Sequence, residues 1–209
     1  MTEALIGLAT HARESAPLAA PAGAVLFRPS DPCGGFLVVQ KGVVRVSLTS
    51  ASGREIVLYR VSPGEICLQT FSCLVQDRPY AAEGIAETPI EGRLIPRAAW
   101  ARLLDTDAAF RSAVMTSIAT RFADYEQVVE TLAFAGLEQR LAAALMRLTT
   151  AEGMVHATHE ALAAEIGSAR EAVSRQLAVF SHEGLVKLSR GHIDVLRRDE
   201  LNRRAHPAM

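Results

Sequence analysis

The sequence predicts an α+β protein in which a strand-rich first half is followed by one long helix and a small helical domain. Three observations lead to this prediction. Short apolar stretches separated by turn residues recur between residues 20 and 100, a stretch without glycine or proline runs from 107 to 134, and paired short helical patterns occupy the C-terminal third. The chain of 209 residues is long enough for one large or two small domains. We expect domain boundaries that give residues 1–106, 107–136 and 137–209.

The first half is expected to fold as a small antiparallel β-roll or jelly roll. Val44, Val46 and Leu48 alternate with Arg45 and Ser47, which is the period of a half-buried strand. Further candidate strands lie at residues 25–27, 36–39 and 56–59. Glycine and proline stand between these segments, and many short strands with glycine at the corners favour a closed antiparallel architecture.

The middle of the chain predicts a long amphipathic helix. Apolar residues recur in steps of three and four, which places them on one stripe of the helix. Its members are Phe110, Val114, Ile118, Phe122, Tyr125, Val129 and Leu132. Such a helix has more turns than a small domain needs to cover its own core, so we expect it to pair with a second copy of itself. The alternative is a helix that packs wholly against its own roll.

Residues 158–177 predict two short helices joined by a tight corner. Thr158 is a good N-cap for the first helix. Gly167 is expected to end it, because glycine accepts the left-handed conformation, and Ser168 is expected to cap the second helix. The second helix has a stripe of apolar residues, Val173, Leu177 and Phe180, for burial. This arrangement is typical of a helix-turn-helix.

The exposed start of the second helix carries long hydrogen-bonding side chains that can read DNA. Arginine can donate two hydrogen bonds to guanine, and glutamate can accept one from cytosine in the major groove. A hairpin around Arg190-Gly191 follows and predicts a wing, whose basic side chains would contact phosphates. The alternative is a helical hairpin with a solvated charged face. The candidate DNA-binding residues are Ser168, Arg170, Glu171, Ser174 and Arg175 on the helices, and Lys187, Arg190 and His192 on the wing.

The three cysteines, Cys33, Cys67 and Cys73, all lie in the first third of the chain. An odd number argues against a structural disulfide framework. Cys67 and Cys73 are six residues apart and would meet if the segment folds back, so we interpret them as candidate sensor thiols. Cys33 lies beside Gly34-Gly35 in a turn that we expect to be exposed, and it is the less favoured candidate sensor. The alternative is that Cys67 and Cys73 are small buried hydrophobes.

Several classes of protein are disfavoured by the sequence. No apolar run approaches the ~20 residues that span a bilayer, and Met1-Thr2-Glu3-Ala4 lacks the basic start and apolar block of a signal peptide. We therefore expect a cytoplasmic protein with no membrane partner. The chain has no H-E-x-x-H, P-loop, nucleophile elbow or paired C-x-x-C, so we do not expect an enzyme.

In its order of roll, long helix and winged helix-turn-helix, the chain resembles the CRP/FNR family of bacterial transcription regulators. Residues 167–175 are similar to the family's recognition-helix signature, and Arg170, Glu171, Ser174 and Arg175 match its base-contact positions. The roll adds Lys41-Gly42, Gly53-Arg54-Glu55 and Pro63-Gly64-Glu65-Ile66. The resemblance implies a homodimer that pairs through the long helix and binds a near-palindromic site in double-stranded DNA. RNA polymerase is a further candidate partner.

The resemblance leaves the signal open. Cyclic-nucleotide binding in the family needs a glutamate and an arginine that precedes a small hydroxyl residue. Here Gln69 stands near the glutamate position, Pro79-Tyr80-Ala81 replaces the arginine element, and Arg78 comes one position early. An iron–sulfur cluster would need a ligand besides the three cysteines, and haem needs one or two axial ligands.

We favour a thiol-based regulator that responds to oxidants or reactive sulfur at Cys67 and Cys73, and we assign it no cofactor. Oxidation or a sulfur-chain bridge would reshape the segment that has lost the nucleotide-binding residues, and would bias the long helix. A small ligand, a cyclic nucleotide, haem and an iron–sulfur cluster remain the alternative signals or cofactors.

Overall fold

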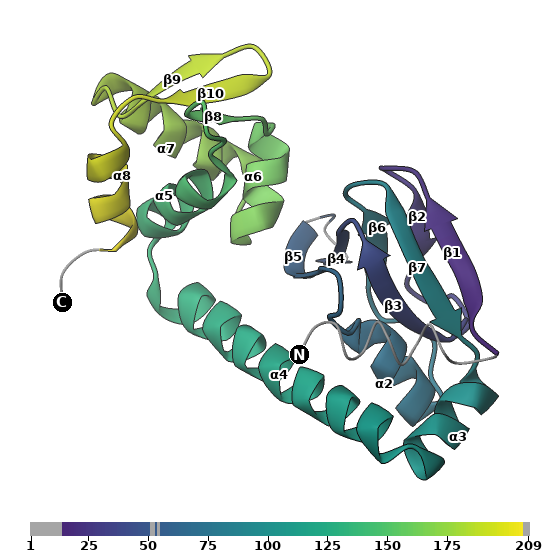
Figure 1. Cartoon of the computed structure of the whole chain (residues 1–209). Helices are drawn as coiled ribbons and strands as arrows, with labels where there is room; N and C mark the ends of the chain where they lie inside the picture. The colour runs from purple at the N-terminus through teal and green to yellow at the C-terminus, as the bar shows by residue number, and fades with distance from the viewer. Residues whose placement is uncertain (1–13, 51–52, 54, 207–209) are drawn as a thin grey trace. The chain divides into compact units, whose positions relative to one another are not determined.

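A computed structural model describes residues 14–50, 53 and 55–206, which form two compact units (Figure 1). The predicted fold class is confirmed: an antiparallel β-roll is followed by one long helix and a winged helix-turn-helix. Met1 to Ala4, Arg54 and the side chain of Leu132, which entered the sequence predictions, lie outside the described part.

Two antiparallel sheets make the roll, with strand orders β1-β7-β3 and β2-β6-β4-β5. Strands that are far apart in the sequence therefore lie side by side. The strands are β1 (Ala16–Ala20), β2 (Val25–Phe27), β3 (Phe36–Lys41), β4 (Val44–Thr49), β5 (Glu55–Val61), β6 (Glu83–Ala86) and β7 (Ile90–Ile95). Glycine is required where β6 pairs with β2, because a Cβ on Gly84 would come within 2.3 Å of the buried Phe27 ring.

A helix interrupts the region that the sequence predicted as strands. α2 (Leu68–Gln76) ends at Asp77, whose left-handed backbone has φ 53°. Its inner face buries Thr70, Cys73 and Leu74 against the roll. Nine residues offer only two turns of apolar periodicity, which is too short a pattern to distinguish from a strand in the sequence alone.

The core of the roll extends to the helices that follow it. Phe36 of β3 is fully buried, and its ring centroid lies 6.2 Å from that of Trp100 in α3 (Arg97–Thr106) and 6.2 Å from that of Phe110. These aromatic contacts fix the start of the long helix against the roll.

The long helix, α4 (Ala108–Phe134), has 27 residues. The Asp107 carboxylate caps it by accepting hydrogen bonds from the N–H groups of Ala109 and Phe110, each at 2.9 Å. The predicted apolar stripe divides into two parts. Phe110 and Val114 are fully buried in the roll's core, whereas Phe122 and Val129 remain 64% and 62% exposed.

The second unit contains four helices around one core, with a three-stranded sheet in the order β8-β10-β9. The predicted hairpin is confirmed, and Gly191 at its turn has φ 86°. The elements are α5 (Leu137–Leu148), β8 (Met154–Val155), α6 (His159–Ile166), α7 (Arg170–His182), β9 (Val186–Ser189), β10 (His192–Val195) and α8 (Arg198–Ala205). In the described part of the chain, no helix is long and apolar enough to cross a membrane.

Candidate DNA-binding surface and cysteine segment

The corner between α6 and α7 forms largely as the sequence predicts. The Thr158 side chain accepts a hydrogen bond from the N–H of Ala161 at 3.0 Å, and Gly167 is left-handed with φ 61°. The prediction that Ser168 caps α7 is wrong. The N–H of Ser168 instead closes the end of α6 on the Ala163 carbonyl at 2.9 Å, so the N-cap position falls to Ala169, which makes no side-chain cap bond.

α7 separates its buried and exposed faces as a recognition helix requires. Val173, Leu177 and Phe180 are fully buried. Arg170, Glu171 and Arg175 are exposed, and Ser174 is half-buried. These four predicted base-contact residues therefore lie within the first two turns of one helix, beyond the core that holds it.

A side chain that sequence reasoning missed orients one of these residues. The Nδ1 atom of His159, the first residue of α6, lies 2.8 Å from the Oγ atom of Ser174. The spacing of 15 residues between them spans the helix-turn-helix corner, so only the folded corner brings the two together. His159 thus restricts the direction in which the Ser174 hydroxyl can donate or accept a further hydrogen bond.

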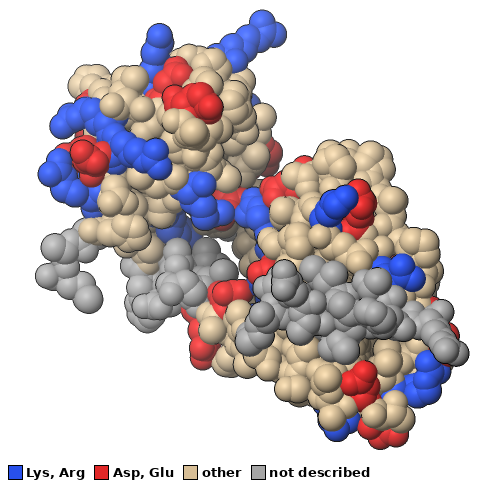
Figure 2. Space-filling model, viewed as in Figure 1, with Lys and Arg blue, Asp and Glu red and all other residues tan. Residues whose placement is uncertain are grey.

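The wing presents two exposed basic residues, Lys187 and Arg190. His192 is half-buried, and its Nε2 atom lies 3.5 Å from a carboxylate oxygen of Asp194. A neighbouring carboxylate makes His192 the weakest of the predicted phosphate contacts. Figure 2 shows Lys and Arg side chains that project from the second unit, with acidic side chains between them.

Other arginines of the second unit stabilise its own fold. Arg204 of α8 forms ion pairs with Glu138 of α5 and, at 3.2 Å, with Glu183 after α7. Arg147 pairs with Glu165, whose side chain is only 7% exposed. These arginines pair with carboxylates on or next to other helices of their own unit, which has 10 basic and 9 acidic residues from 137 to 209.

The cysteines pair differently from the prediction. Cys33 and Cys73 form a disulfide with their Cα atoms 5.8 Å apart, and the predicted meeting of Cys67 with Cys73 is wrong. Because α2 begins at Leu68, the chain rises about 9 Å between residues 67 and 73 and turns them to different sides of the helix. Cys33, expected to be exposed, is half-buried.

Cys67 is a free, completely buried thiol directly before α2. Burial raises its pKa, so it stays protonated at neutral pH. Its Sγ atom lies 4.0 Å from the hydroxyl of Tyr59, and the ring of Tyr59 meets that of Tyr125 on α4 edge to face at 5.6 Å. Burial likewise raises the pKa of Tyr125 to about 12.

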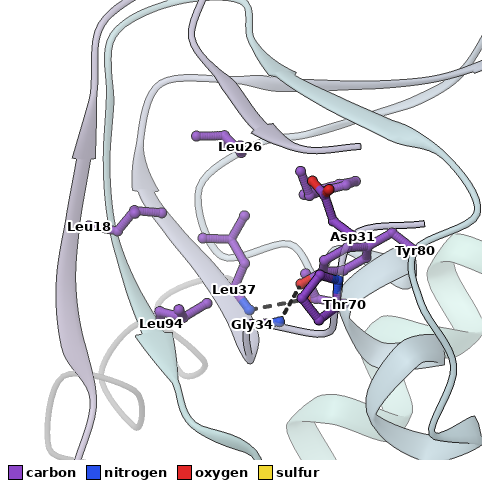
Figure 3. A pocket seen from close by; sticks show the side chains of 10 residues that line it. Leu18, Leu26, Asp31, Gly34, Leu37, Thr70, Tyr80 and Leu94 are labelled. Carbon is purple, nitrogen blue, oxygen red and sulfur yellow. Dashed lines mark hydrogen bonds between the residues drawn. The ribbon is translucent and has the colours of Figure 1, made fainter. Parts of the chain in front are cut away.

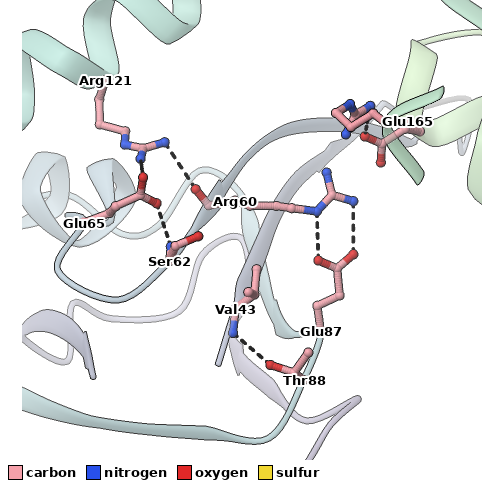
Figure 4. A network of polar contacts seen from close by, with 9 residues as sticks. Val43, Arg60, Ser62, Glu65, Glu87, Thr88, Arg121 and Glu165 are labelled. Carbon is pink, nitrogen blue, oxygen red and sulfur yellow. Dashed lines mark hydrogen bonds and ion pairs between the residues drawn. The ribbon is translucent and has the colours of Figure 1, made fainter. Parts of the chain in front are cut away.

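A second contact joins the cysteine segment to α4 (Figure 4). The Arg121 side chain is only 8% exposed, forms an ion pair with Glu65 and donates a hydrogen bond to the Arg60 carbonyl at 3.2 Å. Glu65 in turn accepts from the N–H of Ser62 at 2.6 Å. The residues before Cys67 are thereby held on the long helix. Sequence reasoning missed this contact, and the position of Arg121 next to Phe122 of the apolar stripe is the signal that could have found it.

The positions that match the family's nucleotide-binding element carry other residues, and one of them, Gln69, makes a contact within the chain. The side-chain oxygen of Gln69 accepts a hydrogen bond from the N–H of Ala81 at 3.2 Å, and Pro79 has no N–H to offer a phosphate. Arg78 is exposed. The donor set therefore does not fit a cyclic phosphate. Among the described residues, no group of three or more His, Cys, Asp or Glu could hold a metal ion.

Comparisons with known proteins cover both units. Residues 17–107 match the cyclic nucleotide-binding domain, and residues 139–204 match the Crp-like helix-turn-helix domain. A cyclic AMP receptor protein from Thermus thermophilus is 27% identical over 84% of this chain and 81% of its own length. A global nitrogen regulator from Synechococcus elongatus is 26% identical over 83% of this chain and 82% of its own length.

A solved structure extends the likeness to nearly the whole chain. It is a transcriptional regulator of the CRP/FNR family from Eubacterium rectale, with a TM-score of 0.85 and 29% sequence identity. The match covers 98% of this chain and 93% of that one. The likeness therefore includes the roll, the long helix and the helix-turn-helix in the same order.

Proposed function

Because the chain belongs to the CRP/FNR family of transcription regulators, we propose that it acts as a homodimer whose DNA affinity depends on the oxidation state of Cys33 and Cys73. We assign the sensor to residues 1–106, dimerisation to 107–136 and DNA reading to 137–209. One observation carries the proposal. Cys73 forms a disulfide with Cys33, and the chain segment just before the helix of Cys73 contacts the long helix.

Base reading is assigned to the exposed start of α7. Arg170 and Arg175 can each donate two hydrogen bonds to a guanine, and Glu171 can accept from a cytosine. Support comes from the exposure of all three side chains above a fully buried helix face. Lys187 and Arg190 of the wing are assigned to phosphates, which position the protein without reading sequence.

This assignment is tested with a duplex selected by the full-length protein from a random pool. The selected site should contain two inverted half-sites about 10 base pairs apart, because a twofold dimer presents two recognition helices. Arg175→Ala should weaken binding to this site by about 1–3 kcal/mol and relax selectivity at one position of each half-site. Arg102→Ala, a surface arginine of the sensor, is the control. Equal affinity of Arg175→Ala and wild type for every sequence would refute the assignment.

Homodimerisation is assigned to the part of α4 that the roll leaves uncovered. Met115, Phe122 and Val129 are exposed by 52%, 64% and 62% and are spaced by seven residues. A seven-residue repeat of apolar side chains is the seam of a two-stranded coiled coil. Half-buried Ile118 and Tyr125 follow at the intermediate positions of the same repeat.

Redox control is supported by the compartment as well as by the geometry. A protein that binds chromosomal DNA works in the reducing cytoplasm, where lasting disulfides are rare and those that form are usually catalytic or regulatory. In the proposed step the thiols of Cys33 and Cys73 lose two electrons and two protons as the sulfur–sulfur bond forms. Hydrogen peroxide can accept them and is reduced to two water molecules. A polysulfide can accept them instead: one of its zero-valent sulfur atoms stays in the bridge as a trisulfide, and a second takes up the two electrons and two protons and leaves as hydrogen sulfide.

The bridge can influence α4 through the segment that leads into α2. Cys73 stands on α2, and Cys67 at its start touches Tyr59, which contacts Tyr125. Glu65, two residues before Cys67, is held by Arg121. Release of Cys73 from Cys33 would free α2 to shift and would change how this segment holds the dimer helix.

Reversible bond formation is tested by mass spectrometry in buffers of graded glutathione potential, with free thiols trapped by alkylation. We expect a two-state change in which Cys33 and Cys73 are protected together, while Cys67 contributes nothing. Cys33→Ser and Cys73→Ser should each abolish the transition, and Cys67→Ala should keep it. A Cys67–Cys73 linkage, or no reversible bond in any of these proteins, would contradict the proposal.

A further inference from the structure

The roll contains a cavity of about 300 Å³ that none of the functions above uses (Figure 3). This volume is at the lower end of the range for small-molecule sites. The lining residues come from both sheets, from the loop around Cys33, from α2 and from the loop that follows α2. They are Leu18, Leu26, Phe27, Asp31, Pro32, Gly34, Leu37, Thr70, Tyr80 and Leu94.

The lining is apolar on most sides and polar at one end. Leu18, Leu26, Leu37 and Leu94 surround an open space in Figure 3, and Asp31, Thr70 and Tyr80 lie across from them. Leu18, Leu26 and Leu94 are only partly buried. The cavity is therefore open to solvent, and the apolar part of a ligand can pack against its leucine side chains.

The polar end determines which chemistry fits. The Tyr80 hydroxyl accepts a hydrogen bond from the N–H of Gly34 at 3.1 Å, so its own proton is left to donate. Burial raises the pKa of Tyr80, which keeps the hydroxyl protonated. The Asp31 carboxylate accepts from the N–H of Arg28 at 2.7 Å and has capacity for a further donor.

Charge excludes anions from this cavity. Asp31 contributes the only formal charge among the ten lining residues, and it is negative. A carboxylate or phosphate would lose its hydration and gain a like charge as its neighbour. The cavity includes Tyr80 of the element that replaces the family's nucleotide-binding residues, but Gln69, Arg78 and Pro79 do not line it.

The disulfide holds one wall of the cavity. Cys33 lies between the lining residues Pro32 and Gly34, and the Sγ atom of Cys73 lies 3.2 Å from the carbonyl oxygen of the lining residue Thr70. The bond between them thus joins two segments that face the same space. Since ligand and disulfide both stabilise the same wall, each should strengthen the other.

We propose that this cavity binds a small, uncharged, mainly apolar molecule that carries one hydroxyl or amide group, and that the Cys33–Cys73 disulfide increases its affinity. The hydroxyl or amide donates to Asp31 and accepts from Tyr80. The inference deepens the proposed function, since it gives the redox-sensitive segment a second signal, but the binding measurement needs no DNA.

The test uses two fluorescent probes with the same ring system, neutral 1-naphthol and anionic 1-naphthoate, titrated into the full-length protein. We expect saturable binding of one 1-naphthol per chain and at least tenfold weaker binding of 1-naphthoate. Leu26→Trp should fill the cavity and weaken 1-naphthol at least tenfold, whereas Leu48→Trp, a partly exposed leucine of β4 that does not line it, should not. Reduction, or Cys33→Ser, should weaken binding about fivefold.

Circular dichroism shows whether Leu26→Trp remains folded, and Leu94→Phe serves as the second filling variant. The proposal is overturned if 1-naphthol does not saturate, if 1-naphthoate binds equally well, if a folded filling variant keeps wild-type affinity, or if reduction leaves the affinity unchanged. Binding of 1-naphthol together with a DNA affinity that ignores oxidation would refute the proposed redox function alone.

Discussion

Cys67 shows how burial can make one thiol less reactive than the other two. Its side chain is completely buried and its pKa is raised, and both properties suppress the reactive thiolate. Cys33 is half-buried, so once reduced it is open to attack by oxidants. Sequence reasoning ranked Cys33 last, because the pairing of Cys33 with Cys73 and the burial of Cys67 depend on how α2 packs, which no local pattern reveals.

Cys67 should therefore react last with iodoacetamide in the reduced, folded protein. We expect Cys33 to be alkylated at least tenfold faster, and all three cysteines to react at similar rates after unfolding. Peptide mass spectrometry over time gives the three rates. Alkylation of Cys67 as fast as Cys33 under native conditions would show that the segment before α2 is open in solution.

We expect His159 to influence DNA recognition through its contact with Ser174 rather than through the apolar core. Loss of its hydrogen bond should free the Ser174 hydroxyl, so we expect His159→Ala to weaken binding to the selected duplex by about 1 kcal/mol, or roughly fivefold. His159→Gln, which retains a hydrogen-bonding group, should recover part of this loss. Fluorescence anisotropy provides the affinities, and His182→Ala at the far end of α7 is the matched control. An unchanged affinity in His159→Ala would remove this residue from the recognition surface.

At the scale of elements, the sequence predicted those that follow a regular pattern over many residues. The alternation in β4, the apolar steps along α4 and the glycine corner at Gly167 each have a local physical cause, and each element forms. The start of α7 was misjudged because the end of α6 uses Ser168 for its own closing hydrogen bond. α2 was missed because two turns give too little periodicity.

The division of the α4 stripe is also beyond sequence reasoning, since it depends on where the roll ends.

The uncovered part of the stripe leads to a specific prediction for dimerisation. Phe122→Glu would place a charge in the proposed dimer seam, and we expect it to weaken dimerisation at least a hundredfold and to abolish tight DNA binding. Thr120→Glu, on the opposite side of the same exposed turn, should leave both intact. Sedimentation velocity distinguishes these outcomes, and a stable Phe122→Glu dimer would place the dimer interface elsewhere.

At the scale of the whole molecule, the family and the order of the units could be inferred from the sequence. The pairing of cysteines in the proposed sensor could not. Cys33 and Cys73 are 40 residues apart in the sequence and meet only because α2 packs beside β3 and the loop that precedes it. No local pattern encodes such a pairing. The same applies to the cavity, which is assembled from strands β1, β2, β3 and β7, from helix α2 and from loops.

We propose that the Cys33–Cys73 bond in the sensor unit sets the affinity of the helix-turn-helix for DNA. The most direct test is the dissociation constant for the selected duplex, measured by fluorescence anisotropy with wild-type protein whose disulfide is intact and with the same protein after reduction. We predict at least a tenfold difference between the two states, and no difference when Cys33→Ser is treated in the same way. Equal affinities of oxidised and reduced wild type, with the disulfide verified by mass in the oxidised sample, would contradict the claim.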